Sequence, residues 1–166
     1  GQCYGDLPTA AKDGWTFDGW YTAPEGGSRI HMVWSDSPCW ETCWNGGFKM
    51  QDALRHESIE CVVVQHPWME NDTLFADIIL PSNTKFETED CDSGQWNVVF
   101  YERQAIQPIG ESKSDKEVVA EVARALEQYG GVYEGMLDKY LGGKTDDEWI
   151  KVGFETSGVP EDLTFE

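Results

Sequence analysis

Positively charged side chains are scarce in this sequence. Its 166 residues contain 12 lysines and arginines against 31 aspartates and glutamates, which gives a formal net charge of −19 at pH 7. A chain this acidic repels the phosphates of nucleic acids and of anionic membranes, so we expect neither nucleic acid nor membrane as a partner. The simplest role of the acidic side chains is to keep the surface soluble.

Long apolar runs are also missing, and the cysteines form no recognisable framework. No segment approaches the roughly 20 apolar residues that span a bilayer, and no signal peptide opens the chain. The five cysteines are an odd number, which argues against a closed set of disulfides. Cys39 and Cys43 have three residues between them, but no second pair with companion histidines follows, so we expect reduced thiols and not a zinc site. Reduced thiols agree with a cytoplasmic location.

An initiator methionine is absent as well, which indicates a fragment of a larger protein. Residues 1–28 are rich in glycine, proline and tryptophan and have no clear period, so we predict an irregular segment there. Hydrophobic residues make up 40% of the chain and aromatic residues 13%, which is a globular composition. We therefore predict one ordinary domain over residues 29–166.

Between residues 30 and 81 strand-like and helix-like patterns alternate. The order is strand, helix, strand, short helix and strand, over 30–34, 47–56, 59–64, 71–75 and 78–80. Such alternation predicts an α/β fold, here a Rossmann-like, mostly parallel sheet with helices on both faces. Ligands bind beyond the carboxyl ends of parallel strands, so the loops 35–39, 65–72 and 81–84 are predicted to converge on one binding edge.

The C-terminal part is predicted to add helices. After a strand-like run at 97–101, Ser114 and Glu117 form the sequence pattern of a capping box, followed by apolar residues at helical spacing. Shorter helices are predicted over 132–141 and 146–154, on either side of Gly142 and Gly143.

Two stretches carry a resemblance to a known family. Residues 71–81, NDTLFADIILP, followed by Thr84 and Glu87, resemble the T-x-x-x-A-D-[IV]-[IV]-L-P-x-x-[ST]-x-x-E segment of the dimethyl sulfoxide reductase family of molybdopterin enzymes. Residues 105–111, AIQPIGE, and the helix after Ser114 resemble that family's P-x-G-E stretch and the helix that follows it. The strand at 30–34 with SDSP after it stands where the family often has a strand and G-x-N-P. Residues 90–103 match the family's next segment only in scattered positions.

The resemblance implies a cofactor-binding domain and not a complete enzyme. The cofactor would be molybdopterin guanine dinucleotide carrying molybdenum, with tungsten as an alternative metal. The segments SDSPCW at 35–40 and QHPWMEND at 65–72 look most like family members that transfer hydroxyl groups between phenols. The implied enzyme is thus an oxidoreductase or hydroxytransferase acting on a phenolic or other small substrate. By the same resemblance, its partners would be the remaining domains of the catalytic subunit and an iron–sulfur subunit. Nothing in this chain resembles an iron–sulfur cysteine cluster or a ligand to the metal.

Polar residues in and beside the three loops are the candidates for binding the cofactor. Thr73 lies near a short helix start, where hydroxyls and free amides can hold phosphate or pterin groups. Asp72 could accept hydrogen bonds from ribose or guanine, as acids do at strand ends, and Pro81 would end a strand at the cofactor edge. The full predicted set is Ser35, Asp36, Ser37, Gln65, His66, Asp72, Thr73, Asp77 and Pro81; catalytic residues are expected outside this chain.

Simpler roles exist for several of these side chains. Asp72 could cap its own short helix, His66 could only hydrogen-bond its loop, and Asp77 could bind loop amides. For the whole chain, one alternative is a binding or scaffold domain that has lost the cofactor. Another is a small hydrolase using Asp72, Asp77 and His66, which no nucleophile elbow or glycine fingerprint supports. One of four tryptophans near the predicted edge could line a phenol pocket, the four being Trp34, Trp40, Trp44 and Trp68.

Overall fold

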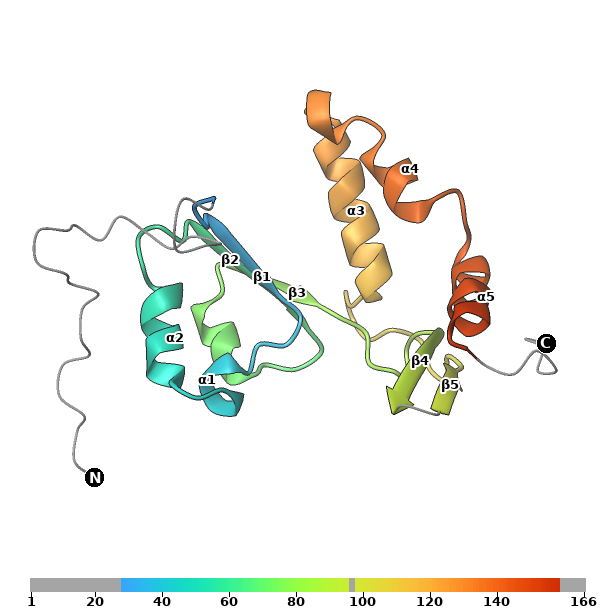
Figure 1. Ribbon diagram of the computed structural model, residues 1–166, viewed down its shortest axis with the longest axis horizontal. Helices are drawn as coiled ribbons and strands as arrows, with labels where there is room; N and C mark the ends of the chain where they lie inside the picture. Colours follow the sequence, from blue (N-terminus) through green and yellow to red (C-terminus); the bar gives the residue numbers. More distant parts are fainter. Residues whose placement is uncertain (1–27, 96–97, 159–166) are drawn as a thin grey trace, which may run out of the picture. The chain divides into compact units, whose positions relative to one another are not determined.

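The computed structural model describes residues 28–95 and 98–158. The chain divides into two compact units, residues 1–80 and residues 81–166, whose elements are labelled in Figure 1. The predicted irregular segment 1–28 lies outside the described residues, apart from Ser28. Within the predicted domain 29–166, the division falls after Leu80.

The first unit is built on a parallel sheet. Its elements in chain order are β1 (Met32–Ser35), α1 (Trp40–Cys43), α2 (Gly47–Leu54), β2 (Cys61–His66), the 3-10 helix η1 (Asn71–Phe75) and β3 (Ile78–Pro81). The strand β2 lies between β1 and β3, and it pairs with β1 in parallel. Each strand expected from the sequence is present, and the predicted α/β fold is confirmed.

The start of β3 lies beside the start of β2. The Asp77 amide donates to the Val62 carbonyl oxygen at 2.8 Å, and the Val62 amide donates to the Asp77 carboxylate at 2.8 Å. The three strands therefore run in the same direction, and their carboxyl ends share one edge of the sheet.

The core of this unit lies on one face of β2. Leu54, Val62 and Val64 form the buried cluster, and α1, α2 and η1 each pack a side chain against it, namely Trp40, Met50 and Phe75. On the other face of β2, Val63 and Gln65 are also buried. Burial on both faces explains why the sequence of β2 is continuously apolar and does not alternate.

A glycine allows α1 to pack closely on α2. A Cβ atom at Gly47 would clash with the backbone carbonyl of Glu41 in α1. The preceding residue, Gly46, has a φ of 83°, a left-handed conformation that L side chains rarely adopt. A side chain at Gly47 would push α1 away from α2, and one at Gly46 would strain the backbone.

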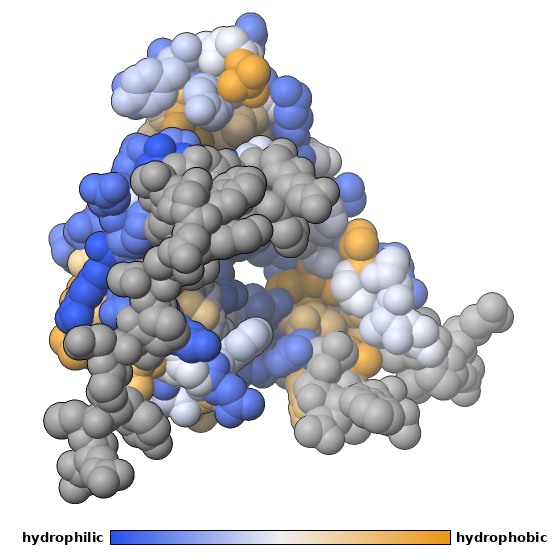
Figure 2. Space-filling view, turned by 60° about the vertical axis from the view of Figure 1, so that its left-hand side comes forward, coloured by the Kyte–Doolittle hydropathy of each residue, from blue (hydrophilic) through white to orange (hydrophobic). Residues whose placement is uncertain are grey.

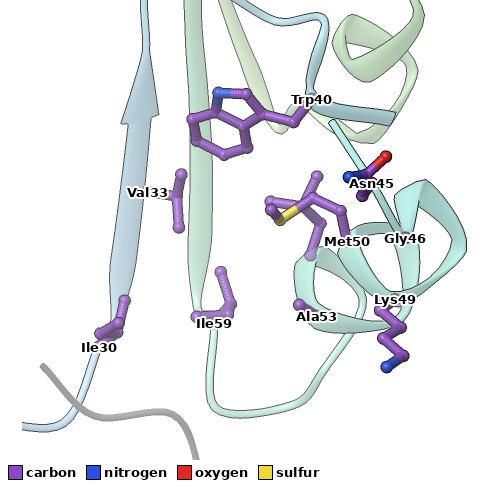
Figure 3. Close-up of a pocket in the computed structure, with 10 residues that line it drawn as sticks. Ile30, Val33, Trp40, Asn45, Gly46, Lys49, Met50, Ala53 and Ile59 are labelled. Carbon is purple, nitrogen blue, oxygen red and sulfur yellow. The ribbon is translucent and has the colours of Figure 1, made fainter. Parts of the chain in front are cut away.

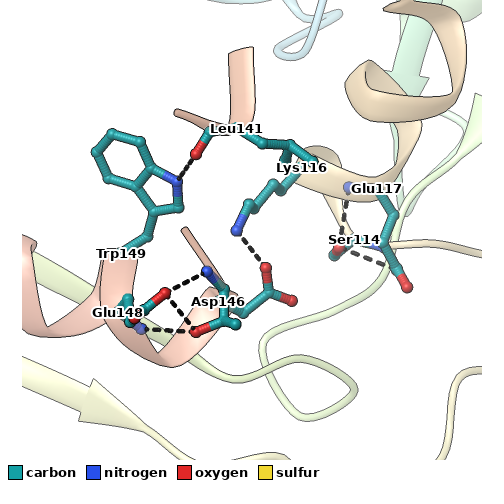
Figure 4. Close-up of polar contacts among 8 residues, drawn as sticks. Ser114, Lys116, Glu117, Leu141, Asp146, Glu148 and Trp149 are labelled. Atoms are coloured by element: carbon teal, nitrogen blue, oxygen red, sulfur yellow. Dashed lines mark hydrogen bonds and ion pairs between the residues drawn. The ribbon is translucent and has the colours of Figure 1, made fainter. Parts of the chain in front are cut away.

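The second unit combines a hairpin with helices. Its elements are β4 (Asp90–Gln95), β5 (Val98–Glu102), α3 (Asp115–Glu127), the 3-10 helix η2 (Gly131–Tyr133), α4 (Met136–Leu141) and α5 (Asp146–Thr156). β4 and β5 are antiparallel. The capping box at Ser114 and Glu117 is confirmed at the start of α3, and a second box at Thr145 and Glu148 begins α5 (Figure 4).

Candidate functional site

The loop after β1 meets the segment after β2. The Asp72 amide donates to the Pro38 carbonyl oxygen at 3.1 Å. The Asp72 carboxylate accepts hydrogen bonds from the amides of Trp40, at 2.6 Å, and Glu41, at 3.1 Å. Only 3% of Asp72 is exposed, and Pro38 is fully buried. Two of the three predicted loops are therefore joined at the carboxyl edge of the sheet, and Asp72 is the residue that joins them.

Two buried polar side chains line the strand ends on either side of this junction. Ser35 ends β1, and its hydroxyl accepts the Ser37 amide at 3.2 Å. Gln65 lies in β2, and its carbonyl oxygen accepts the indole N–H of Trp34 at 3.1 Å. Ser35 and Gln65 are buried, and both have hydrogen-bond partners. Their side chains therefore hold both strand ends in place.

Two further members of the predicted set, Asp36 and Ser37, follow β1 directly and are exposed. His66 is half-buried, and its Nδ1 lies 3.1 Å from the Trp68 carbonyl oxygen and 3.3 Å from the Trp68 amide nitrogen. This contact closes the turn after β2, and a role of His66 in cofactor binding stays a prediction. Asp36 and Ser37 are the side chains of the loop after β1 that a ligand can reach.

Asp77 lies apart from this junction, and Pro81 belongs to the second unit. The Asp77 carboxylate is bonded to the start of β2, at the opposite end of the strands from the loops. Pro81 ends β3 and is the first residue of the second unit. Its carbonyl oxygen accepts the Lys113 amide at 3.2 Å. The structure therefore brings together the predicted residues 35–37, 65–66 and 72–73, and it does not bring Asp77 to them.

The loop 81–84 is held inside the second unit by a buried glutamate. The Glu87 carboxylate accepts the amide and hydroxyl of Thr84, at 2.8 and 2.7 Å, and the Ile109 amide at 2.8 Å. The Thr84 bonds are the main reason that the pKa of Glu87 lies below its ordinary value. The hydroxyl of Ser82 donates to Asp115 at 2.9 Å, so the loop is attached to the start of α3.

Two buried side-chain atoms have no hydrogen-bond partner in the part of the chain that the structure describes. They are the hydroxyl of Thr73 and the side-chain oxygen of Asn83. Buried polar atoms are almost always paired in native proteins, so each exception calls for an explanation. Thr73 belongs to the predicted set and Asn83 lies in the third predicted loop. Sequence reasoning did not single out Asn83, because its position in the family pattern accepts any residue.

The segments 35–39 and 65–73 contain acidic residues and no lysine or arginine. Their acids are Asp36, Glu70 and Asp72. The pKa of the Cys39 thiol is raised, chiefly by a hydrogen bond with Cys43 and by burial, with Glu70 and Asp72 adding to the effect. Phosphates bound here would accept hydrogen bonds from amides and hydroxyls. The N–H and O–H groups of guanosine could instead donate hydrogen bonds to the carboxylates.

An apolar pocket of about 440 Å³ lies between β1 and the helices α1 and α2. Figure 3 shows Val33, Trp40 and Met50 around it. Among the four tryptophans noted in the sequence, Trp40 lines this pocket, whereas Trp44 and Trp68 are exposed by 66% and 64%. The pocket adjoins the core, and of its lining residues only Trp40 is one that the sequence suggests as a candidate for lining a pocket.

None of the described helices combines the length and apolar character that crossing a membrane requires.

A family model described as molybdopterin oxidoreductase matches residues 30–125, which is more than half of the chain. These residues include the loops after β1, β2 and β3 and most of α3.

Three curated proteins are similar to this chain. The pyrogallol hydroxytransferase large subunit of Pelobacter acidigallici is 29% identical over 160 residues, which cover 88% of this chain and 17% of that protein. The dimethyl sulfoxide reductase DmsA of Escherichia coli is 30% identical over 113 residues, covering 64% and 13%. The probable oxidoreductase YjgC of Bacillus subtilis is 31% identical over 83 residues, covering 50% and 8%. The chain spans less than a fifth of each relative, and it belongs to the molybdopterin oxidoreductase family.

Proposed function

We propose that this chain is one wall of the cofactor site in the catalytic subunit of a molybdopterin oxidoreductase or hydroxytransferase. The cofactor would be the guanine dinucleotide form of molybdopterin, with molybdenum or tungsten as its metal. Family membership and the joined loops at the carboxyl edge of the sheet support this proposal. The single observation that carries it is the unpaired, buried hydroxyl of Thr73 beside those loops.

The residues at this edge fit a polar, guanylated ligand. The hydroxyl of Thr73 can donate one hydrogen bond and accept others. Asp36 and Ser37 are exposed and offer a carboxylate and a hydroxyl. Because the segments 35–39 and 65–73 lack cationic side chains, we assign the guanosine end of the cofactor to this edge. When bound, the cofactor supplies the redox and oxygen-transfer chemistry, and the residues named here orient it.

The substrate and partners are proposed from the relatives. One relative is named as a hydroxytransferase for pyrogallol, so we propose a phenolic or other small substrate for the complete enzyme. Since the chain spans only 17% of that relative, the remaining domains of the catalytic subunit and an iron–sulfur subunit would complete the site in the cytoplasm. The isolated chain is expected to show no hydroxyl transfer, because a single wall supplies few of the contacts that a cofactor needs.

A titration with guanosine diphosphate tests the proposed role of Thr73. We expect weak binding, observed by NMR as shifts of the amides in residues 35–38 and 65–73. Thr73→Val replaces the hydroxyl with a methyl group of similar size, and it should weaken binding about fivefold, the effect of one hydrogen bond worth about 1 kcal/mol. The stability of the variant should be unchanged or higher, since the hydroxyl has no partner in the described part of the chain.

The matched control is Thr42→Val, which changes an exposed threonine in the same unit and should leave binding unchanged. Equal binding by the wild type and Thr73→Val would contradict the assignment of Thr73. Absence of binding at this edge would instead favour the alternative of a scaffold domain that has lost the cofactor.

A further inference from the structure

The two cysteines of the loop after β1 lie one helical turn apart. Cys39 is the N-cap of α1, Cys43 is its last residue, and the Cys43 amide donates to the Cys39 carbonyl oxygen at 2.8 Å. Residues four apart share one face of a helix, with Cα atoms about 6 Å apart. Disulfides form across Cα separations of about 4.4–6.8 Å, so this pair lies within reach of a covalent bond.

Both cysteines are reduced and one of them is accessible. Neither is in a disulfide, Cys43 is exposed and Cys39 is half-buried. The Cys43 contact and the acids Glu70 and Asp72 raise the pKa of Cys39, which keeps Cys39 protonated. The accessible Cys43 is therefore the thiol that reacts first with an external reagent.

The two cysteines do not form a metal site. No group of three or more histidine, cysteine or acidic side chains able to hold a metal occurs among residues 28–95 and 98–158. Two thiols without a third ligand provide too few ligands for a four-coordinate zinc site. Two adjacent thiols can instead form a disulfide when an oxidant, such as another disulfide, accepts two electrons.

We propose that Cys39 and Cys43 are a reversible thiol–disulfide pair that is oxidised by small dialkyl disulfides. The Cys43 thiolate attacks one sulfur of the reagent, forming a mixed disulfide and releasing one thiolate. The Cys39 thiol then loses its proton and attacks the sulfur of Cys43, which releases the second thiol. The protein loses two electrons and two protons, and the reagent gains both.

Closing this bond must distort α1. Cβ atoms four residues apart on a helix are about 5–6 Å apart, whereas a disulfide needs about 3.8 Å. A disulfide between Cys39 and Cys43 would close a ring that contains Trp40 and Glu41. The amides of these two residues bind the Asp72 carboxylate. Oxidation therefore pulls these amides away from Asp72 and loosens the junction between the loops after β1 and β2. The strain also makes the disulfide easy to reduce.

The test treats the complete 166-residue chain with 2-hydroxyethyl disulfide at about pH 8.5, where thiolates are present. We expect the mass to fall by two hydrogen atoms and peptide mapping to locate the bond between Cys39 and Cys43. Cys39→Ser and Cys43→Ser should each abolish this loss, whereas the matched control Cys61→Ser should keep it. A mixed disulfide that never closes, or a bond from Cys43 to another cysteine, would overturn the proposal.

Hydrogen exchange tests the effect on Asp72. In the oxidised protein the amides of Trp40 and Glu41 should exchange on the order of tenfold faster, as expected for the loss of a hydrogen bond to a charged group, and dithiothreitol should restore the slow exchange. Unchanged exchange in the disulfide form would overturn the coupling. Neither measurement uses the cofactor, so failure here leaves the proposed cofactor role unaffected.

Discussion

The carboxylate of Asp72 shows how one side chain can organise a strand-end edge. Both of its oxygens accept backbone amides of α1, and its own amide is bonded to Pro38. It therefore satisfies two of the amide donors at the start of a helix that has no other cap. A ligand at this edge would meet a loop that is already fixed in place.

Removing this carboxylate should destabilise the first unit. Asp72→Ala leaves the part-buried amides of Trp40 and Glu41 without their acceptor, at an expected cost of about 2–3 kcal/mol. Asp72→Asn retains one acceptor oxygen and should cost roughly half as much. Urea unfolding followed by tryptophan fluorescence measures both. The control Asp36→Ala changes an exposed acid in the loop after β1 and should shift stability by less than about 0.5 kcal/mol.

The capping role of Asp72 could not be assigned from the sequence. Local patterns suggested a cap for its own helix or a contact to guanine, but the amides that it binds are 31 and 32 positions earlier in the chain. Capping rules consider only the next few residues, whereas this contact depends on the packing of η1 against α1. Whether Asp72 also contacts a cofactor stays a prediction.

Glu87 should make the second unit sensitive to acid. Its hydrogen bonds with Thr84 lower its pKa in the folded state below the ordinary value of 4.5. A carboxylate with a lowered folded pKa stabilises the protein fully above its unfolded pKa, and the stabilisation is lost as the pH falls through the folded value. We expect the unfolding free energy to decrease below about pH 4.5.

Glu87→Gln should reduce this dependence on pH without abolishing it. Glu121 and Glu148 also have lowered pKa values, because of Lys113 and Thr145 respectively, and they would account for the remainder. Thermal unfolding between about pH 3 and pH 7 measures the slope. Glu111→Gln, at an exposed position, should leave the slope unchanged. If Glu87→Gln also left it unchanged, Glu87 would not contribute to acid sensitivity.

At the level of elements, α3 depends on its capping box. The Ser114 hydroxyl accepts the Glu117 amide at 3.2 Å, and the Glu117 carboxylate accepts the Ser114 amide at 2.8 Å. Ser114→Ala should cost about 1 kcal/mol, because one amide of the first turn loses its partner. Ser114→Asp restores an acceptor and should recover most of this loss in urea unfolding. Equal losses for the two variants would show that the hydroxyl does not act as a cap.

The elements that could be predicted are those whose signals are local. The apolar run of β2 and the capping box of α3 each identify an element from a few adjacent residues. β4 was missed because its sequence, DCDSGQ, has little preference for a strand. It forms because β5 pairs with it, and its register shifts between Asp92 and Gln95. Pairing between strands is a property of the folded chain that a single segment does not reveal.

At the scale of the whole molecule, many large apolar side chains are exposed. In the first unit, Trp68, Met69 and Leu74 are 64%, 69% and 80% exposed, and they lie next to Asp72 and Thr73 in sequence. Figure 2 shows hydrophobic residues at the surface of the face in view. Exposed apolar groups of this size are typical of surfaces that contact other proteins or domains. This agrees with a chain that spans less than a fifth of its relatives.

The net charge of −19 also has a consequence for the proposed cofactor, because both are anionic. Repulsion over the whole chain opposes the approach of a diphosphate, and salt screens it over a Debye length of about 10 Å at 0.1 M. The affinity for guanosine diphosphate should therefore rise several-fold between about 10 and 150 mM salt. The affinity for uncharged guanosine should stay constant, and NMR titration measures both. A diphosphate affinity that falls with salt would reveal a local cationic site. The predicted rise would mean that the charges neutralising the phosphates come from the rest of the enzyme.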